Sequence, residues 1–230
     1  MRRFKLTPLP TSAVPFELDG AEAHHLLHVL RAKVGDSVQM FDGLGSSLDC
    51  KIITCDSDIV RLEPIGVPQC QVSADELRTV LVMAQVKPKA LDVVIRMATE
   101  LGVTEFIIFP SAHSISREPK LERWSRLSVA AAKQCGRNTL PKLTWLPSLA
   151  EAWNAISDEI TVRLVAHPNA DSEAPTQSIP TAIFVGPEGG FRDDEVAWLC
   201  EHGAFPITLG QWVLRADTAA TVAAAIMRKT

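Results

Sequence analysis

Two short glycine-bearing segments near the carboxyl end of the chain carry the residues best suited to binding a ligand. Residues 185–191 are Val-Gly-Pro-Glu-Gly-Gly-Phe, and residues 209–215 are Leu-Gly-Gln-Trp-Val-Leu-Arg. Each segment overlaps or follows a short apolar run that is typical of a buried strand, residues 181–185 and residues 205–209. Glycine lets main-chain N–H groups approach a bound molecule closely, and open α/β sheets bind ligands at the carboxyl ends of their strands. Together the two segments predict a ligand site.

The second segment runs into a helical pattern, which favours an anionic group as its ligand. Arg215 and nearby main-chain amides should lie close to a helix amino terminus, where carboxylates and phosphates bind. The sequence has no Gly-Lys-Ser or Gly-Lys-Thr after the glycines, and the spacing is not Gly-x-Gly-x-x-Gly. It also lacks the Gly-x-Ser-x-Gly elbow of many hydrolases. These three common site classes are therefore disfavoured.

The composition indicates a soluble, folded, cytoplasmic protein. The 230 residues are 47% hydrophobic and 22% charged, enough for one large core or for a core with a small appendage. The five cysteines are scattered and form no Cys-x-x-Cys pair, which argues against disulfides and a structural zinc site. No apolar run is long enough to cross a bilayer, and the basic amino terminus lacks the apolar segment of a signal peptide. We therefore expect no membrane association.

Three histidines close together raise the question of a metal site. His24, His25 and His28 are interspersed with leucine and valine, an ordinary apolar helix face, and no acidic or cysteine ligands accompany them. Zinc normally requires three or four well-placed ligands. We therefore expect no metal, and a histidine that packs in the core or touches RNA is the favoured interpretation.

The first 70 residues predict a small, separate domain. Short β-type runs at residues 37–41, 48–54 and 59–64 are broken by turn residues, and a helical segment at 20–31 precedes them. This pattern is typical of a small β-barrel. Residues 64–76 contain two prolines and a glycine and are a plausible linker.

The pattern changes from residue 77, and residues 77–230 predict an α/β domain. A fully apolar strand at 79–86, a helix at 89–101 and a second apolar strand at 103–109 indicate a parallel βαβ unit. Further strands are predicted at 142–145, 161–166, 181–185 and 205–209, and further helices at 148–156, 192–202 and 217–229. The fold class is thus α/β with a parallel sheet.

One predicted helix, residues 120–137, has a basic face opposite an apolar one. The surrounding segment, residues 117–142, holds seven basic and two acidic residues, a local charge of +5 in a chain of net charge −4. Binding to a phosphate backbone depends on where the charge lies rather than on its total. The scarcity of acids in this segment favours an anionic partner such as RNA.

The motifs together resemble the bacterial 16S ribosomal RNA uridine-N3 methyltransferases, members of the SPOUT class of trefoil-knotted enzymes that use S-adenosylmethionine. The match includes the two glycine segments and runs almost from end to end. Its other parts are His-His-Leu at 24–26, Phe-Asp-Gly at 41–43, Thr-Glu-Leu-Gly-Val at 99–103, Ala-Ala-Lys-Gln-Cys-Gly-Arg at 131–137 and Leu-Arg-Ala-Asp-Thr-Ala at 214–219. The resemblance implies a PUA-like RNA-binding β-barrel at the amino terminus, a knotted catalytic domain, and a homodimer with its active site near the subunit interface.

The resemblance also implies a function: methylation of N3 of a uridine in 16S ribosomal RNA of the small subunit, with S-adenosylmethionine as cofactor. Glu188 would orient the uracil or take its N3 proton, and Arg215 would stabilise the resulting charge. The implied cofactor-binding residues are Ala166, His167, Gly186, Pro187, Glu188, Gly189, Gly190, Leu209, Gly210, Val213, Leu214, Thr218 and Ala219. The implied RNA-binding residues are Arg2, Arg3, His25, Arg31, Arg117 and Arg137.

Several alternatives stay open. Glu188 could instead cap the following helix and pair with Arg215, and Trp212 could be a stacking platform or ordinary buried apolar surface. The protein could be a SPOUT methyltransferase acting on another RNA or position, including a ribose 2′-hydroxyl, or a non-catalytic RNA-binding assembly protein. A nucleotide hydrolase is disfavoured.

Overall fold

The computed structural model describes residues 1–70, 77–115, 118–172 and 179–228. The chain forms two compact units. The amino-terminal unit comprises Met1–Ala74 and Ala132–Leu140, and the carboxyl-terminal unit comprises Asp75–Ala131 and Pro141–Thr230. Each unit has its own hydrophobic core.

The amino-terminal unit is built on a six-stranded sheet. Its strands follow the order β1-β3-β4-β5-β2, with β6 pairing with β4; β1 is parallel to β3, and the other pairs are antiparallel. The strands are β1 (Arg2–Lys5), β2 (Phe16–Leu18), β3 (Ser37–Phe41), β4 (Ser46–Cys55), β5 (Val60–Pro64) and β6 (Gln69–Cys70). Side chains alternate along them, as Val60 and Leu62 of β5 show: both are buried while their neighbours face solvent.

The structure corrects two sequence expectations in this unit. The helix predicted at residues 20–31 is a short α-helix, α1 (Gly20–His24), followed by a π-helical turn, η1 (His25–Val29), and it ends before Arg31, whose φ is +49°. The strands β1, β2 and β6 are absent from the prediction. They are only two to four residues long, and the charged sequence of β1 shows no alternation of apolar and polar residues.

Arg3 of β1 is tied into the amino-terminal unit instead of being free for a ligand. Its Nε donates to Gln39 Oε1 at 2.8 Å, its Nη1 donates to the carbonyls of Ala132 and Arg137 at 2.9 and 3.1 Å, and its Nη2 donates to Asn138 Oδ1. Burial lowers the pKa of this guanidinium. The arginine therefore joins the first strand to residues 132–138, which follow it by more than a hundred positions.

We expect Arg3→Met to lower the free energy of unfolding by about 2–4 kcal/mol, because it leaves several partly buried acceptors without their donor. Urea unfolding followed by circular dichroism measures the change. The matched control is Arg2→Met, since Arg2 is an exposed neighbour whose ion pair with Asp36 spans 3.4 Å. Its effect should stay below about 1 kcal/mol. Equal effects of the two substitutions would contradict a structural role for Arg3.

The carboxyl-terminal unit contains a six-stranded sheet in which all neighbouring strands are parallel, in the order β12-β10-β11-β7-β8-β9. The strands are β7 (Thr79–Ala84), β8 (Glu105–Phe109), β9 (Lys142–Trp145), β10 (Val162–Ala166), β11 (Thr181–Val185) and β12 (Phe205–Ile207). Every residue of β7, β8 and β11 is buried, which explains why these strands are apolar without alternation after their first residue.

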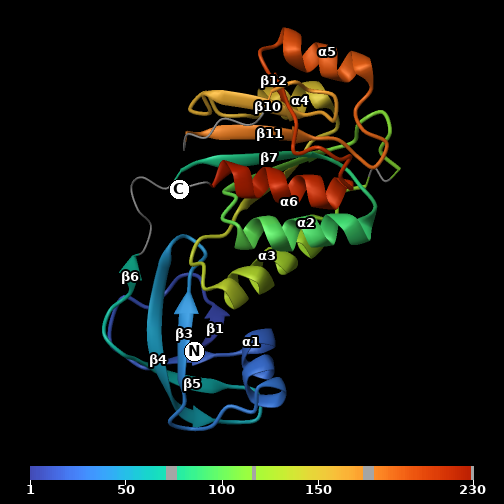
Figure 1. Cartoon of the computed structure of the whole chain (residues 1–230). Coiled ribbons are helices and arrows are strands. Elements are labelled where there is room, and N and C mark those ends of the chain that lie inside the picture. Colours follow the sequence, from blue (N-terminus) through green and yellow to red (C-terminus); the bar gives the residue numbers. More distant parts are fainter. Residues whose placement is uncertain (71–76, 116–117, 173–178, 229–230) are drawn as a thin grey trace. The chain divides into compact units, whose positions relative to one another are not determined.

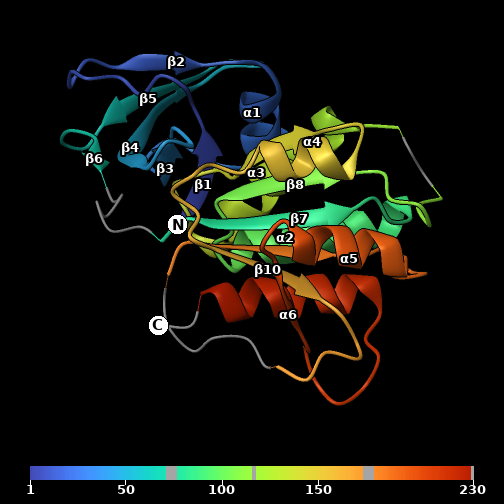
Figure 2. The same cartoon turned by 90° about the horizontal axis from the view of Figure 1, so that it is seen from above.

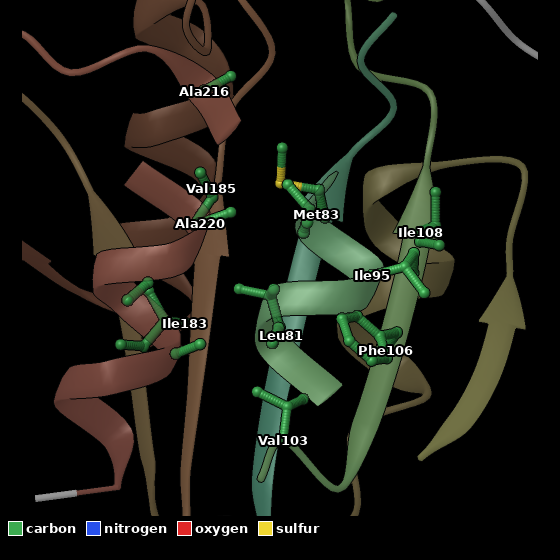
Figure 3. Packing of buried hydrophobic residues seen from close by; sticks show 14 of the residues in the cluster. Leu81, Met83, Ile95, Val103, Phe106, Ile108, Ile183, Val185, Ala216 and Ala220 are labelled. Carbon is green, nitrogen blue, oxygen red and sulfur yellow. The ribbon is translucent and has the colours of Figure 1, made fainter. Parts of the chain in front are cut away.

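Helices cover both faces of this sheet (Figures 1 and 2). One face packs against α2 (Pro88–Glu100), α3 (Leu121–Cys135) and α6 (Ala216–Met227), and the other against α4 (Leu149–Asn154) and α5 (Asp193–Glu201). In Figure 3, the side chains of Leu81 and Met83 of β7 and of Ile183 of β11 lie on the first of these faces, in the core that the sheet forms with α2, α3 and α6. The alanines of α6 that face inward allow this helix to approach both the strands and α2 closely.

The parallel α/β architecture predicted for residues 77–230 is confirmed, with most boundaries within one or two residues of those expected. The strand expected at 205–209 ends at Ile207, so Thr208 and Leu209 belong to the following loop. Within the described parts of the chain, no helix is both long enough and apolar enough to span a membrane. The trefoil knot that the resemblance implies stays a prediction.

Candidate functional site

A cleft opens where three neighbouring parallel strands end. The loops after β10, β11 and β12 all leave the same edge of the sheet, because parallel strands bring their carboxyl ends together. The cleft has a volume of about 270 Å³. Its lining residues are Ala166, His167, Pro168, Val185, Gly186, Pro187, Glu188, Gly189, Gly190, Phe191, Thr208, Leu209, Gly210, Trp212, Val213, Leu214, Ala216 and Ala219. This is the edge at which the sequence predicts a ligand site.

The structure brings all but one of the cofactor-binding candidates to this cleft. Thr218 is the exception: it is exposed on the first turn of α6 and its main-chain N–H donates to Asp217 Oδ1 at 3.0 Å. The cleft is also lined by five residues that were not among the predicted cofactor-binding residues: Pro168, Val185, Phe191, Thr208 and Ala216. Val185 and Phe191 belong to the glycine segment 185–191, and the other three are signalled in the sequence only by being next to a candidate site residue.

Main-chain packing makes glycine necessary at position 186. A Cβ added to Gly186 would lie 2.9 Å from the amide nitrogen of Phe191 and 3.1 Å from the carbonyl carbon of Gly190. Both atoms belong to the backbone of the same loop, so no side-chain rotation could relieve the contact. The loop after β11 is thus folded back on itself beside the cleft, with main-chain groups instead of side chains at its closest point.

His113, to which the sequence analysis assigned no role, holds the glycine loop from outside. Its Nδ1 lies 3.1 Å from the carbonyl oxygen of Gly189 and 3.1 Å from that of Gly190. Both partners are acceptors, so Nδ1 must carry the hydrogen. The neighbouring main-chain N–H of Ala112 donates to Glu195 Oε1 of α5 at 3.0 Å, which fixes the segment after β8 from a second side.

Glu188 and Arg215 line a second cavity, which shares a wall with the cleft. This cavity has a volume of about 450 Å³ and is lined by Lys87, Lys89, Ala90, Glu188, Val213, Leu214, Arg215, Ala216 and Asp217. Four of these residues, Glu188, Val213, Leu214 and Ala216, also line the cleft. Both candidate catalytic residues therefore lie beside the predicted ligand site.

The sequence left open that Glu188 caps the following helix and pairs with Arg215, but the structure gives both residues other partners. Glu188 Oε1 accepts a hydrogen bond from the main-chain N–H of Lys87, at the start of α2, at 3.1 Å. At the start of α5 it is Glu195 that accepts from the N–H of Arg192, at 2.9 Å. Glu188 thus contacts the amino-terminal end of α2, far from it in sequence, rather than capping α5, the helix that follows it.

Arg215 pairs with Asp217 rather than with Glu188. Its Nε and Nη2 lie 3.2 and 3.3 Å from the two carboxylate oxygens of Asp217. The hydrogen bond with Asp217 raises the pKa of Arg215, and the negative charge of Glu188 adds a smaller contribution in the same direction. The Arg215 side chain is 81% exposed, and its guanidinium keeps donors for a ligand.

Trp212 is not buried apolar surface. It is 76% exposed and Val213 is 81% exposed, both in the loop that borders the cleft. An apolar pair so exposed at the rim of a site is available to a ligand or a partner.

The RNA-binding candidates have different surroundings. Arg2 and Arg31 are exposed, His25 meets the ring of Phe4 edge-on at 6.2 Å, and Arg137 Nε donates to Thr139 Oγ1 at 2.8 Å. The internal network of Arg3 argues against phosphate contact by that residue. Arg117 lies outside the described residues. All the described candidates belong to the amino-terminal unit.

Carboxylates from elsewhere in the chain partly neutralise the basic face of α3. Arg123 forms a two-point ion pair with Asp92, with N–O distances of 2.9 and 2.5 Å, and Lys133 Nζ lies 2.5 Å from Glu22 Oε1. The local excess of +5 in the sequence is therefore smaller in the folded protein than the sequence indicates.

Among the described residues, no three His, Cys, Asp or Glu side chains come together as a metal-binding group. The rings of His24 and His28 lie 4.7 Å apart, centre to centre, one turn apart along the chain. Their environment supplies no third ligand of these kinds in the parts of the chain that the structure describes.

Comparisons with known proteins agree with this geometry. Residues 73–228 match the family model of an RNA methyltransferase domain, and residues 18–65 match that of an RNA methyltransferase PUA domain. Ribosomal RNA small subunit methyltransferase E of Rickettsia conorii is 30% identical over 219 residues, covering 89% of this chain and 85% of the relative.

Two solved structures are similar along almost the whole chain. The ribosomal RNA small subunit methyltransferase E of Neisseria gonorrhoeae, bound to S-adenosylmethionine, has a TM-score of 0.88 and 28% identity, covering 99% of this chain and 96% of that one. A methyltransferase structure from Legionella pneumophila with the same bound cofactor has a TM-score of 0.86 and 26% identity, with coverages of 98% and 96%.

Proposed function

This chain belongs to the RNA methyltransferase family, and we propose that it transfers a methyl group from S-adenosylmethionine to N3 of a uridine in 16S ribosomal RNA. The observation that carries the proposal is the cleft at the ends of β10, β11 and β12, with Glu188 and Arg215 beside it. Similar proteins with bound S-adenosylmethionine, and relatives that act on small-subunit ribosomal RNA, support it.

The residues present fit this cofactor. Main-chain groups of the glycine loops can bond to the polar edge of an adenine, while Leu209, Leu214 and Ala219 offer apolar contact to its faces. The absence of a side chain at Gly186 keeps the backbone close to the bound molecule. When bound, S-adenosylmethionine supplies an electrophilic methyl group on its sulfonium centre. The protein's part is to orient the acceptor toward that group, which accounts for a large share of catalysis in transfer reactions.

The acceptor must also lose a proton, because the N3 lone pair of uracil is delocalised while N3 carries hydrogen. Glu188 is the proposed base, or the group that orients the N3–H, and Arg215 is the proposed cation that stabilises the uracil anion. Asp217 holds the Arg215 guanidinium by two hydrogen bonds and so fixes the direction in which its remaining donors point.

The amino-terminal unit is the proposed RNA-binding module. Its match to a PUA domain and the exposed Arg2 and Arg31 support this role. We further propose the domain division at residues 1–70 and 77–230, apart from residues 132–140, which belong to the first compact unit. We also propose a homodimer with its active site near the subunit interface, and a cytoplasmic location.

The first test is methyl transfer from radiolabelled S-adenosylmethionine to small ribosomal subunits that lack this modification, followed by mapping of the product nucleotide. A single N3-methyluridine in 16S ribosomal RNA is the expected result. A methyl group on another base or on a ribose would overturn the proposed position, and cofactor binding without transfer to any ribosomal RNA would favour a non-catalytic assembly role.

The contact of His113 with the glycine loop gives a further expected result. His113→Ala should weaken S-adenosylmethionine binding by about 5- to 30-fold, since the loss of a hydrogen bond of this kind is worth about 1–2 kcal/mol. His113→Asn places an N–H donor near the position of Nδ1 and should restore most of the affinity. Calorimetric titration of the cofactor measures both, and equal affinities for the alanine variant and the wild type would show that the loop keeps its conformation without His113.

A further inference from the structure

The proposed function assigns S-adenosylmethionine to the cleft, but it assigns no ligand to the second cavity beside it. Its volume of about 450 Å³ falls within the roughly 300–1,000 Å³ typical of small-molecule sites. Glu188, Val213, Leu214 and Ala216 separate it from the cleft and line both. A molecule in the second cavity would therefore lie against the same residues that a bound cofactor contacts, which is the place that the acceptor of a transferred group must take.

The residues that line this cavity include more cations than anions. Its cations are Lys87, Lys89 and Arg215, and its anions are Glu188 and Asp217. Asp217 is already engaged by Arg215 and by the N–H of Thr218. Glu188 accepts from the main-chain N–H of Lys87, not from its ammonium group.

Both lysine ammonium groups are thus left for a ligand. Lys87 and Lys89 are exposed, and over the described ranges neither ammonium forms an ion pair. Two cations beside a cavity that adjoins a methyl-transfer site suit an anionic part of the acceptor. In RNA that part is the backbone phosphate, which accompanies every base.

We propose that the second cavity receives the target nucleotide, and that Lys87 and Lys89 hold a phosphate of the RNA backbone next to it. This inference rests on the proposed function, and it adds the residues that position the substrate. Glu188 and Arg215 then face the base, while the lysines fix the strand that carries it. Lys87 and Lys89 are positioning residues: they bind substrate and take no part in the proton transfer.

The test compares Lys87→Ala and Lys89→Ala with Arg96→Ala. Arg96 is an exposed cation of the same helix, α2, outside the lining of either cavity, so the control matches the change in charge. Lys87→Ala keeps the main-chain N–H that donates a hydrogen bond to Glu188, so the substitution removes the ammonium group and its side chain without breaking that bond. Undermethylated small ribosomal subunits are the RNA probe, and S-adenosylmethionine is titrated separately.

Each lysine variant should weaken binding of the subunits by about fivefold at about 0.15 M salt, and should make the slope of log affinity against log salt shallower by about one. Cofactor affinity should not change, and Lys89→Arg should restore RNA binding. Arg96→Ala should bind both molecules as the wild type does.

Two results would overturn the proposal. One is a lysine variant whose RNA affinity and salt slope equal those of Arg96→Ala. The other is a comparable loss of affinity for S-adenosylmethionine, which would assign the lysines to the carboxylate of the cofactor. Binding and salt dependence are measured without turnover, so a wild-type protein that fails to methylate N3 would refute the proposed reaction while the subsite would still be judged by these data.

Discussion

Gly186→Ala is expected to lower kcat/KM for methyl transfer by about a hundredfold or more, since displacement of a binding loop by about 1 Å can cost that much. The added methyl group would stand 2.9 Å from the amide nitrogen of Phe191 and 3.1 Å from the carbonyl carbon of Gly190. The loop after β11 must move as a whole, because its own backbone is in the way. Cofactor titration and steady-state kinetics measure the loss.

Gly203→Ala provides the control for this substitution. Gly203 has a φ of +102°, and no atom lies within 4 Å of the position of an added Cβ. The substitution should therefore cost stability through backbone strain, about 1 kcal/mol or more, while cofactor binding stays normal. Thermal unfolding of both variants separates a local loop displacement from a general loss of folded protein. Normal cofactor affinity in Gly186→Ala would show that the loop does not contact the cofactor.

Glu188→Gln is expected to reduce kcat by about 10²- to 10⁴-fold, the usual contribution of a positioned general base. The amide oxygen of glutamine can still accept from the N–H of Lys87, so the contact that Glu188 makes at 3.1 Å is retained and only the charge and basicity are removed. Affinity for the cofactor should change little. Single-turnover methyl transfer measures the chemical step apart from product release.

Glu201→Gln is the isosteric control, because Glu201 is an exposed carboxylate at the end of α5 and lines neither cavity. It should transfer methyl groups at the wild-type rate. Full turnover by Glu188→Gln would remove this residue from the chemistry and leave Arg215, with the RNA itself, to promote loss of the N3 proton.

The parts of the fold that follow from periodicity were predictable. After their first residue, a buried threonine, the strands β7 and β11 are apolar because both faces of the sheet are covered, and this run is typical of a strand in a parallel sheet. The short strand β1 was not predictable in this way. Arg3 lies inward on it because acceptors from residues 132–138 meet its guanidinium, and no local pattern reveals partners so distant in sequence.

In the site, too, the residues within sequence motifs were predictable, whereas contacts between residues far apart in the sequence were not. The glycine segments locate the cleft, since the loops of neighbouring strands must share an edge. His113 and Lys89 lie in loops or helix starts that carry no motif, and only the three-dimensional structure brings them to residues 186–190 and 213–217. Side-chain pairing was likewise beyond the sequence: Asp92 and Glu22 reduce a positive charge that looks unopposed when residues 117–142 are counted alone.

Residues 132–140 belong to the amino-terminal unit, although the residues immediately before them, 75–131, belong to the carboxyl-terminal unit. The chain passes from one unit to the other after residues 74, 131 and 140, so the amino-terminal unit is a discontinuous domain. A fragment that stops at residue 70 would keep Gln39 but lack the other acceptors of Arg3, in residues 132–138, and the ammonium partner of Glu22. During synthesis the first unit cannot complete its contacts until residue 140 of the 230 has left the ribosome. Recombination at a single junction after residue 74 would separate residues 1–74 from residues 132–140. Transfer of the complete amino-terminal unit to another protein therefore requires more than one junction.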